Sequence, residues 1–172
     1  MDAVAVGAGC AEFYVFLITY GTWGVILFLD FDGVLHPEPP GSRLFCNLPR
    51  LEAVLRDHPS IEVVISSTWR ERLGWNEILE LFSADIRSCI IGYTPHHNEF
   101  SSQAEIGRYP RESECREWLR NNDRYDLDWI ALDDRPWWFR PFCQHLIICQ
   151  HSIGFDAEVE AKLRERLVHV GR

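Results

Sequence analysis

One short segment constrains this chain more than any other: the apolar run Val25–Leu29 ends directly in the sequence DFDGV, residues 30–34. A carboxylate that follows a buried strand loses its hydration, which is costly unless another group compensates the charge. Asp32 adds a second negative charge two residues after Asp30, and a divalent cation with oxygen ligands would neutralise both. Gly33 permits the tight turn that brings backbone close to a ligand. The two aspartates could instead cap a turn, but their pairing after an apolar strand favours a cation site.

Short apolar runs alternate with amphipathic stretches from residue 25 onward. Strands that are apolar on both faces and alternate with helices indicate a parallel sheet covered on both sides. We therefore predict an α/β fold, namely a three-layer Rossmann-like parallel sheet of about five strands with helices on both faces and no large cap domain. The expected strands are 25–29, 61–65, 89–92, 129–132 and 146–149, and the expected helices are 49–58, 75–82, 111–120 and 156–169.

A chain of 172 residues fits one domain. We expect this domain to span residues 24–172 and to follow an N-terminal extension, residues 1–23. Residues 13–29 contain no charge, but this run is short for a membrane span and glycines interrupt it. No basic residues precede the run, as a secretory signal would require. We therefore expect no membrane segment.

The formal net charge of −9 argues against a broad nucleic-acid-binding face, which would need a basic surface. It is compatible with a small, local basic pocket. Lys162 is the only lysine, so any cationic catalytic role must fall to arginine. The six cysteines are widely spread without a CxxC pair, and several lie inside apolar runs. This usage is typical of reduced thiols in a cytoplasmic protein.

Polar side chains also follow two other expected strands. Ser66 is the first hydroxyl after the strand at 61–65 and can donate a hydrogen bond to a phosphoryl oxygen. Ser67 and Thr68 could instead cap the next helix, whose positive end favours an anion. Asp133 and Asp134 follow the strand at 129–132. Asp133 would complete an octahedral Mg²⁺ shell, and Asp134 would either bind the ion or hold one of its waters.

These segments resemble the haloacid dehalogenase-like (HAD) hydrolase superfamily. Its DxDG[TV] signature matches residues 30–34, its strand-end Ser/Thr matches Ser66, and its late acidic pair matches Asp133 and Asp134. The stretches SSTWRE (66–71) and IGYTP (91–95), with the Arg–helix–Trp-Leu pattern at 111–119, are similar to the small, capless HAD domains of Swiss Army Knife RNA repair-like proteins. The resemblance covers roughly residues 25–155.

The resemblance implies a Mg²⁺-dependent phosphomonoesterase. Asp30 would attack phosphorus to form an aspartyl-phosphate, and Asp32 would act as the acid/base partner. The metal would be held by Asp30, Asp32 through its carbonyl, Asp133 and Asp134. Ser66 and Arg111 would hold the phosphoryl oxygens, and the substrate would also contact Ser67, Arg70 and Gly33.

The cationic role is the one departure from the family pattern, which usually has a lysine before the last acidic motif. Arg111 is our candidate because it begins the helix before the fourth strand, and an arginine can bind phosphate through two parallel hydrogen bonds. Arg108 and Arg70 are alternatives. Arg111 could equally be an ordinary solvated residue of a first helical turn.

The substrate is not defined by the sequence. The usual cap insertion points, residues 36–48 and 94–110, are too short to form a core, so we expect an open site that suits a bulky phosphorylated macromolecule or a nucleic-acid end. Small substrates remain compatible. One alternative class is a non-catalytic phosphate- or partner-binding domain with the same fold. A receiver-like signalling domain is a weaker alternative, because the third strand ends in Gly92 and no strand-end lysine follows.

Three neighbouring features have competing interpretations. Aromatic residues 137–139 could stack on a base, but we favour their anchoring a loop in the core. The histidines at 96–97 could touch substrate near the mouth of the site. A set of zinc-type side chains would share one strand face and could not easily converge on one ion, so a buried strand is favoured. This set is Cys143, His145, Cys149 and His151.

Overall fold

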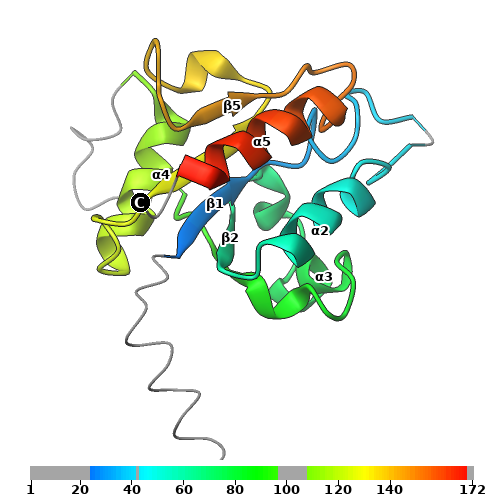
Figure 1. Ribbon diagram of the computed structural model, residues 1–172, viewed down its shortest axis with the longest axis horizontal. Coiled ribbons are helices and arrows are strands. Elements are labelled where there is room, and N and C mark those ends of the chain that lie inside the picture. Colours follow the sequence, from blue (N-terminus) through cyan, green and yellow to red (C-terminus); the bar gives the residue numbers. More distant parts are fainter. Residues whose placement is uncertain (1–23, 42, 97–107, 170–172) are drawn as a thin grey trace, which may run out of the picture.

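The structure, a computed structural model, describes residues 24–41, 43–96 and 108–169. Five parallel strands form one sheet in the order β3-β2-β1-β4-β5 (Figure 1). The α/β class and the number of strands are as predicted. The strands are β1 (Val25–Leu29), β2 (Ile61–Ile65), β3 (Ile90–Tyr93), β4 (Trp129–Asp133) and β5 (Leu146–Ile148).

Strand β1 lies at the centre of the sheet, and all five of its residues are buried. Leu29 is in register with Ile65 of β2 and with Leu132 of β4. Because the three strands are parallel and end level with one another, the residues that follow them meet at one edge. This register brings together the polar residues that the sequence places after separate strands.

Helices cover both faces of the sheet, which confirms the three-layer architecture. Leu27 and Leu29 face one hydrophobic cluster, which includes side chains of α2, α3 and α5. Ile26 and Phe28 face a second cluster with α4, where the Phe28 ring meets Trp118 edge-on at 5.9 Å between centroids. The helices are α2 (Leu48–Asp57), α3 (Trp75–Glu80), α4 (Pro110–Asn121) and α5 (Ala157–His169).

The four predicted helices are present, and their ends differ from prediction by at most two residues. Helices α2 and α5 lie side by side on one face (Figure 1), joined by ion pairs between Arg50 and Glu160 at 2.8 Å and between Arg164 and Asp57 at 2.9 Å. The sequence did not predict three short 3₁₀ turns, which lack the length for a helical apolar period. They are η1 (Thr68–Glu71), η2 (Arg87–Cys89) and η5 (Pro136–Trp138).

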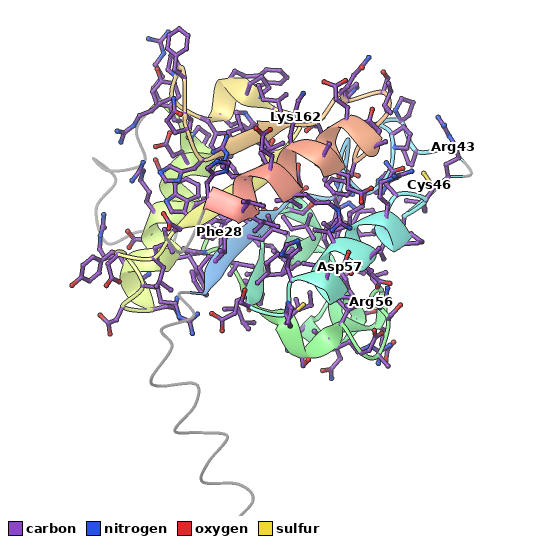
Figure 2. The ribbon with its side chains drawn as sticks, in the orientation of Figure 1. Phe28, Arg43, Cys46, Arg56, Asp57 and Lys162 are labelled. Carbon is purple, nitrogen blue, oxygen red and sulfur yellow. The ribbon has the colours of Figure 1, made fainter. Side chains whose placement is uncertain are left out.

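The segment between β1 and α2 forms a loop without a core of its own. Asn47, at the end of this loop, holds it together: its side-chain amide donates to the carbonyl oxygens of Val34, near the start of the loop, at 3.1 Å and of Ile153 at 2.9 Å. Arg43 and Cys46 lie exposed at the outer edge of the molecule (Figure 2). No large cap covers the sheet among the described residues, although much of the second insertion point, residues 97–107, lies outside them.

The predicted extension, residues 1–23, also lies outside the described residues. Within the part that is described, no helix is both long and apolar enough to cross a membrane.

Candidate active site at the carboxyl end of the sheet

Three buried carboxylates gather where β1 and β4 end. Asp30 follows β1, Asp133 is the last residue of β4, and Asp134 comes next. The backbone N–H of Asp30 donates to the carbonyl oxygen of Leu132 at 3.1 Å, which ties the two strand ends together. One oxygen of each carboxylate lies within 4.8 Å of the other two, and each of the three residues is 5% exposed or less.

Burial makes this group of charges expensive. It raises the pKa of Asp30, although the Arg111 guanidinium and a hydrogen bond from the Ser67 hydroxyl oppose the rise. The pKa of Asp133 lies well above its usual value because of burial and the nearby Asp30 charge. Within the described residues, Asp133 Oδ2 and Asp134 Oδ1 are buried without a hydrogen-bond partner. Orphaned carboxylate oxygens at this spacing fit a hard divalent cation.

The side chain of Asp32 is placed differently from those of the other acidic residues. Its carboxylate is not part of the three-carboxylate group. Oδ1 lies 3.0 Å from His36 Nε2, and Oδ2 accepts a hydrogen bond from Trp69 Nε1 at 3.0 Å. Asp32 could therefore serve a metal only through its backbone carbonyl, because its side chain is engaged elsewhere.

The two serines after β2 are both buried, but they have different contacts. The Ser66 N–H donates to the Leu29 carbonyl at 2.9 Å, which fixes this strand end beside β1. The Ser67 hydroxyl hydrogen-bonds the Asp30 carboxylate and caps η1 by accepting from the Trp69 N–H at 3.5 Å. Ser67 rather than Ser66 is therefore the hydroxyl with a contact to Asp30, and Ser67 also has the capping role that the sequence offered for it.

Arg111 enters the site from the start of α4 and is 3% exposed, so it is not a solvated first-turn residue. Its Nη1 donates to Glu114 at 2.9 Å, and its Nε lies 3.4 Å from the orphaned Asp133 Oδ2. Burial lowers the pKa of Arg111, but the charges of Asp30, Asp133 and Glu114 outweigh this and raise it. Arg111 is therefore a permanent cation beside the carboxylates.

The alternative arginines lie elsewhere. Arg70 donates from Nη1 to the carbonyl oxygens of Ser66 at 2.9 Å and Ser67 at 2.8 Å, and it pairs with Glu114 at 3.2 Å. Burial lowers the pKa of Arg70, and Glu114 partly opposes this. Arg108 is exposed. Of the three, Arg111 is the one that interacts with the acidic group. Arg70 instead holds the backbone of the two serines.

The sequence matches one protein family, described as the HAD domain in Swiss Army Knife RNA repair proteins, over residues 26–159. The match spans more than half of the chain and includes the aspartates, serines and arginines of the site. The chain belongs to this family. No curated protein and no solved structure matched it.

In this HAD domain, a second group of side chains surrounds Asp134. His151 Nδ1 lies 2.8 Å from Asp134 Oδ2, and Glu38 lies within the same 4.8 Å range. Arg135 pairs with Glu38 at 2.9 Å and lies 3.6 Å from Asp134 Oδ1. Because this guanidinium already supplies positive charge, the group fixes Asp134 and ties the loop after β1 to the end of β4.

Gly33 lies against the same carboxylate. Its φ of +70° is in the left-handed region, and an added Cβ would lie 2.3 Å from Asp134 Oδ2. Both facts require glycine at this position. Gly33 was predicted to bring backbone close to a ligand, and here it brings the first motif turn against Asp134.

A pocket of about 200 Å³ adjoins the HAD site on the side of Arg111. One of its walls is Trp138, a half-buried ring with the Arg111 guanidinium 5.1 Å and the Arg135 guanidinium 4.9 Å from its centroid. His96 also lines the pocket, whereas His97 lies outside the described residues. The full lining is Thr68, Arg70, Glu71, His96, Pro110, Arg111, Glu114 and Trp138.

Residues 137–139 divide between the two interpretations. Phe139 is buried in the second hydrophobic cluster and anchors the loop, which is the interpretation that the sequence favoured. Trp137 is 64% exposed, and Trp138 packs between the cluster and the pocket. The aromatic run therefore does not act as one unit.

The prediction that the zinc-type residues share one face of a strand is wrong. Strand β5 ends at Ile148, and Cys143 packs in the second cluster while Cys149 is buried in the first, on the opposite face of the sheet. His145 stacks on Trp129 at 4.0 Å between centroids. The five described cysteines are free thiols, and none belongs to a possible metal-binding group among the described residues.

Sequence reasoning missed several site residues. The spacing of Asp32 to His36 and of Arg111 to Glu114 could have suggested local pairs. No local signal marks the others, because their contacts join segments that are distant in sequence. The missed residues are His36, Glu38, Trp69, Glu114, Arg135 and His151.

Proposed function

We propose that this HAD domain is a Mg²⁺-dependent phosphomonoesterase that works through an aspartyl-phosphate. The main support is the group of three buried carboxylates with two orphaned oxygens next to a permanent cation. A site that served only as structure would gain nothing from burying this repulsion. The arrangement provides the charges needed to bind and stabilise a phosphoryl group during transfer.

The proposed first step is attack on phosphorus by an Asp30 oxygen. The new bond joins this oxygen to phosphorus while the bond to the leaving oxygen breaks, and Asp32 gives that oxygen a proton. Asp32 then takes a proton from a water that attacks the phosphorus, which releases phosphate and restores Asp30. Bound Mg²⁺, held by Asp30, Asp133 and Asp134 and by the Asp32 carbonyl, would supply charge stabilisation for the phosphoryl oxygens.

The other residues hold the phosphoryl group and the nucleophile. Arg111 faces the phosphoryl oxygens, and Ser66 lies at the adjoining strand end with its hydroxyl available as a donor. Ser67 orients the Asp30 carboxylate through its hydrogen bond. Arg70 donates to the carbonyl groups of the two serines, so it would influence substrate binding indirectly, by holding the serine backbone in place.

We propose a phosphorylated nucleic-acid end as the substrate class. The support is the family description, which names RNA repair, and the absence of a large cap over the described part of the site. The pocket beside Arg111 offers an aromatic wall and guanidinium groups for a nucleotide next to the phosphate. With a net charge of −9, binding would depend on local contacts in this pocket and not on a wide basic face.

The proposal is tested with purified protein, Mg²⁺ and p-nitrophenyl phosphate. We expect hydrolysis that EDTA abolishes and that added Mg²⁺ restores, and we expect Asp30→Asn to lower kcat by at least about 10³-fold because the nucleophile is lost. Asp126→Asn, at an exposed position, is the matched control and should retain full activity. Full activity in Asp30→Asn protein would exclude the proposed nucleophile.

The same assay separates the arginines and the substrate classes. Arg111→Lys should lower kcat/KM by about 10²-fold because the bidentate geometry is lost, whereas Arg108→Ala should change it little.

The substrate is tested with oligonucleotides phosphorylated at the 3′ or 5′ end, compared with free nucleotides, sugar phosphates and phosphopeptides. Phosphate binding without turnover of any of these would favour the non-catalytic alternative.

A further inference from the structure

Both carboxylate oxygens of Asp32 are held by side chains from different parts of the chain. His36 Nε2 lies 3.0 Å from Oδ1, and the Trp69 indole N–H donates to Oδ2 at 3.0 Å. His36 follows the first motif turn, and Trp69 is part of η1 after β2. An indole nitrogen can only donate, so the role of Oδ2 as an acceptor is fixed.

His36 is fully buried, at 0% exposure, in aromatic surroundings. Its ring meets Phe45 edge-on at 5.2 Å and Trp69 at 5.9 Å between centroids. Its other nitrogen, Nδ1, has no hydrogen-bond partner among the described residues. A bare N–H there would cost more than a bare lone pair, so we assign the proton to Nε2, which then donates to Asp32.

The two hydrogen bonds keep the Asp32 carboxylate out of the three-carboxylate group. This matters because a carboxylate that binds a metal ion must stay ionised and could not give a proton to a leaving group. Each Asp32 oxygen retains another lone pair, and the side chain is 29% exposed, so a proton can still reach it. The contacts thus fix the direction of Asp32 without blocking proton transfer.

We propose that His36 and Trp69 are positioning residues for the acid/base Asp32: together they hold its carboxylate toward the leaving-group oxygen and away from the metal ligands. This inference rests on the proposed phosphomonoesterase function. A purely structural role explains the arrangement less well, because an apolar side chain at position 36 would fill the same aromatic surroundings without an orphaned nitrogen.

The test compares two substrates that differ in their need for an acid. An alkyl phosphate has a poor leaving group that must be protonated, whereas p-nitrophenolate leaves readily without a proton. We expect Trp69→Phe, which keeps an aromatic ring but removes the donor, to lower kcat/KM for the alkyl phosphate by about 10²-fold. For p-nitrophenyl phosphate, the same variant should lower kcat/KM by less than about threefold.

His36→Gln, which can keep an amide donor near Nε2, should retain more alkyl phosphatase activity than His36→Leu, and the two variants provide a second route if Trp69→Phe folds poorly. Asp32→Asn should show the same dependence on the leaving group, and adding Trp69→Phe to it should cause no further loss. Trp75→Phe is the matched control, since Trp75 contacts Tyr93 at 5.9 Å and has no contact with Asp32.

Equal losses on the two substrates in folded, active variants would overturn the positioning role and leave the phosphomonoesterase proposal intact. A wild-type protein without Mg²⁺-dependent hydrolysis of either substrate would instead overturn the proposed function, and this inference with it. Circular dichroism of each variant verifies that the fold is retained.

Discussion

At the scale of single residues, one guanidinium compensates much of the charge that the fold buries at the end of the sheet. Arg111 is 3% exposed and interacts with Asp30, Asp133 and Glu114. Glu114 in turn pairs with Arg70, which holds the backbone of the two serines. Buried charges are tolerated when they are paired in this way, so the site is a connected network of ion pairs.

Gly33→Ala tests the close approach of the first motif to Asp134. The new Cβ would meet Asp134 Oδ2 at 2.3 Å, on a backbone with φ of +70°. We expect the free energy of unfolding to fall by about 2–4 kcal/mol and hydrolysis to be lost, because Asp134 must move.

Gly41→Ala is the control for this variant. Gly41 also has a positive φ, of +55°, but nothing lies within 4 Å of an added Cβ. The free energy of unfolding of Gly41→Ala should fall only by the cost of the left-handed backbone, about 1 kcal/mol, and the variant should keep its activity. Similar urea midpoints for the two variants would contradict the steric explanation.

The thiol of Cys89 gives a pH-dependent prediction away from the active site. Burial raises its pKa to about 11, so very little thiolate forms near neutral pH. Its alkylation by iodoacetamide should therefore rise about tenfold per pH unit from about pH 7 to about pH 9, without a plateau. Peptide mass spectrometry measures the rate, and the exposed Cys46 should react before Cys89. A plateau below about pH 9 would contradict the raised pKa.

At the scale of elements, a buried acidic side chain on α2 holds the chain that follows α3. Glu52 is 4% exposed and accepts hydrogen bonds from the Ser83 N–H at 2.7 Å and the Ser83 hydroxyl at 2.6 Å. Arg56, one turn later, contacts Glu52 and also pairs with Asp85 at 2.7 Å. The loop before β3 is thus fixed to α2 by side chains, whereas the sheet itself is fixed by backbone hydrogen bonds.

Glu52→Ala should lower the free energy of unfolding by about 2–3 kcal/mol, because it leaves Ser83 donors unpaired near the core. Glu158→Ala is the comparison: Glu158 is 76% exposed and pairs only with Lys162 on the same helix in the described structure. Its loss should cost less than about 0.5 kcal/mol. Urea unfolding measures both, and equal costs would show that Glu52 is not a structural contact of this kind.

At the scale of the whole molecule, the active site and the stability of the fold oppose each other. The three carboxylates lie at the junction of the central strands β1 and β4, so their repulsion acts on the core of the sheet. Functional sites commonly retain such unfavourable contacts, and the rest of the fold offsets them. Here two helix layers and a fully buried central strand provide that stability.

Asp134→Asn tests this opposition. It removes one charge and places an amide donor beside the two remaining carboxylates, so the metal-free variant should melt no lower than the wild type. Addition of Mg²⁺ should raise the wild-type Tm, and this rise should be lost in the variant because a ligand is missing. Differential scanning fluorimetry with and without EDTA measures both. A variant that is less stable without metal yet still responds to Mg²⁺ would contradict the proposed ligand set.

The sequence by itself determined the architecture and the position of the acidic residues. The bounds of β1 and β2 agree with prediction, and the other strands differ by one residue at one or both ends. This succeeds because apolar runs and helical periodicity are local properties of the chain. The places of Asp30 and Asp133 followed from the same logic, since parallel strands present their carboxyl ends at one edge.

Only the tertiary structure decided how these residues divide their roles. It turned Asp32 toward His36 and Trp69, gave the Asp30 contact to Ser67, and brought His151 against Asp134. These outcomes depend on strand order and on loops that pack across the sheet, which local patterns do not specify. A side chain's partner is set by which distant segment fills the space beside it, and that space exists only once the layers have assembled.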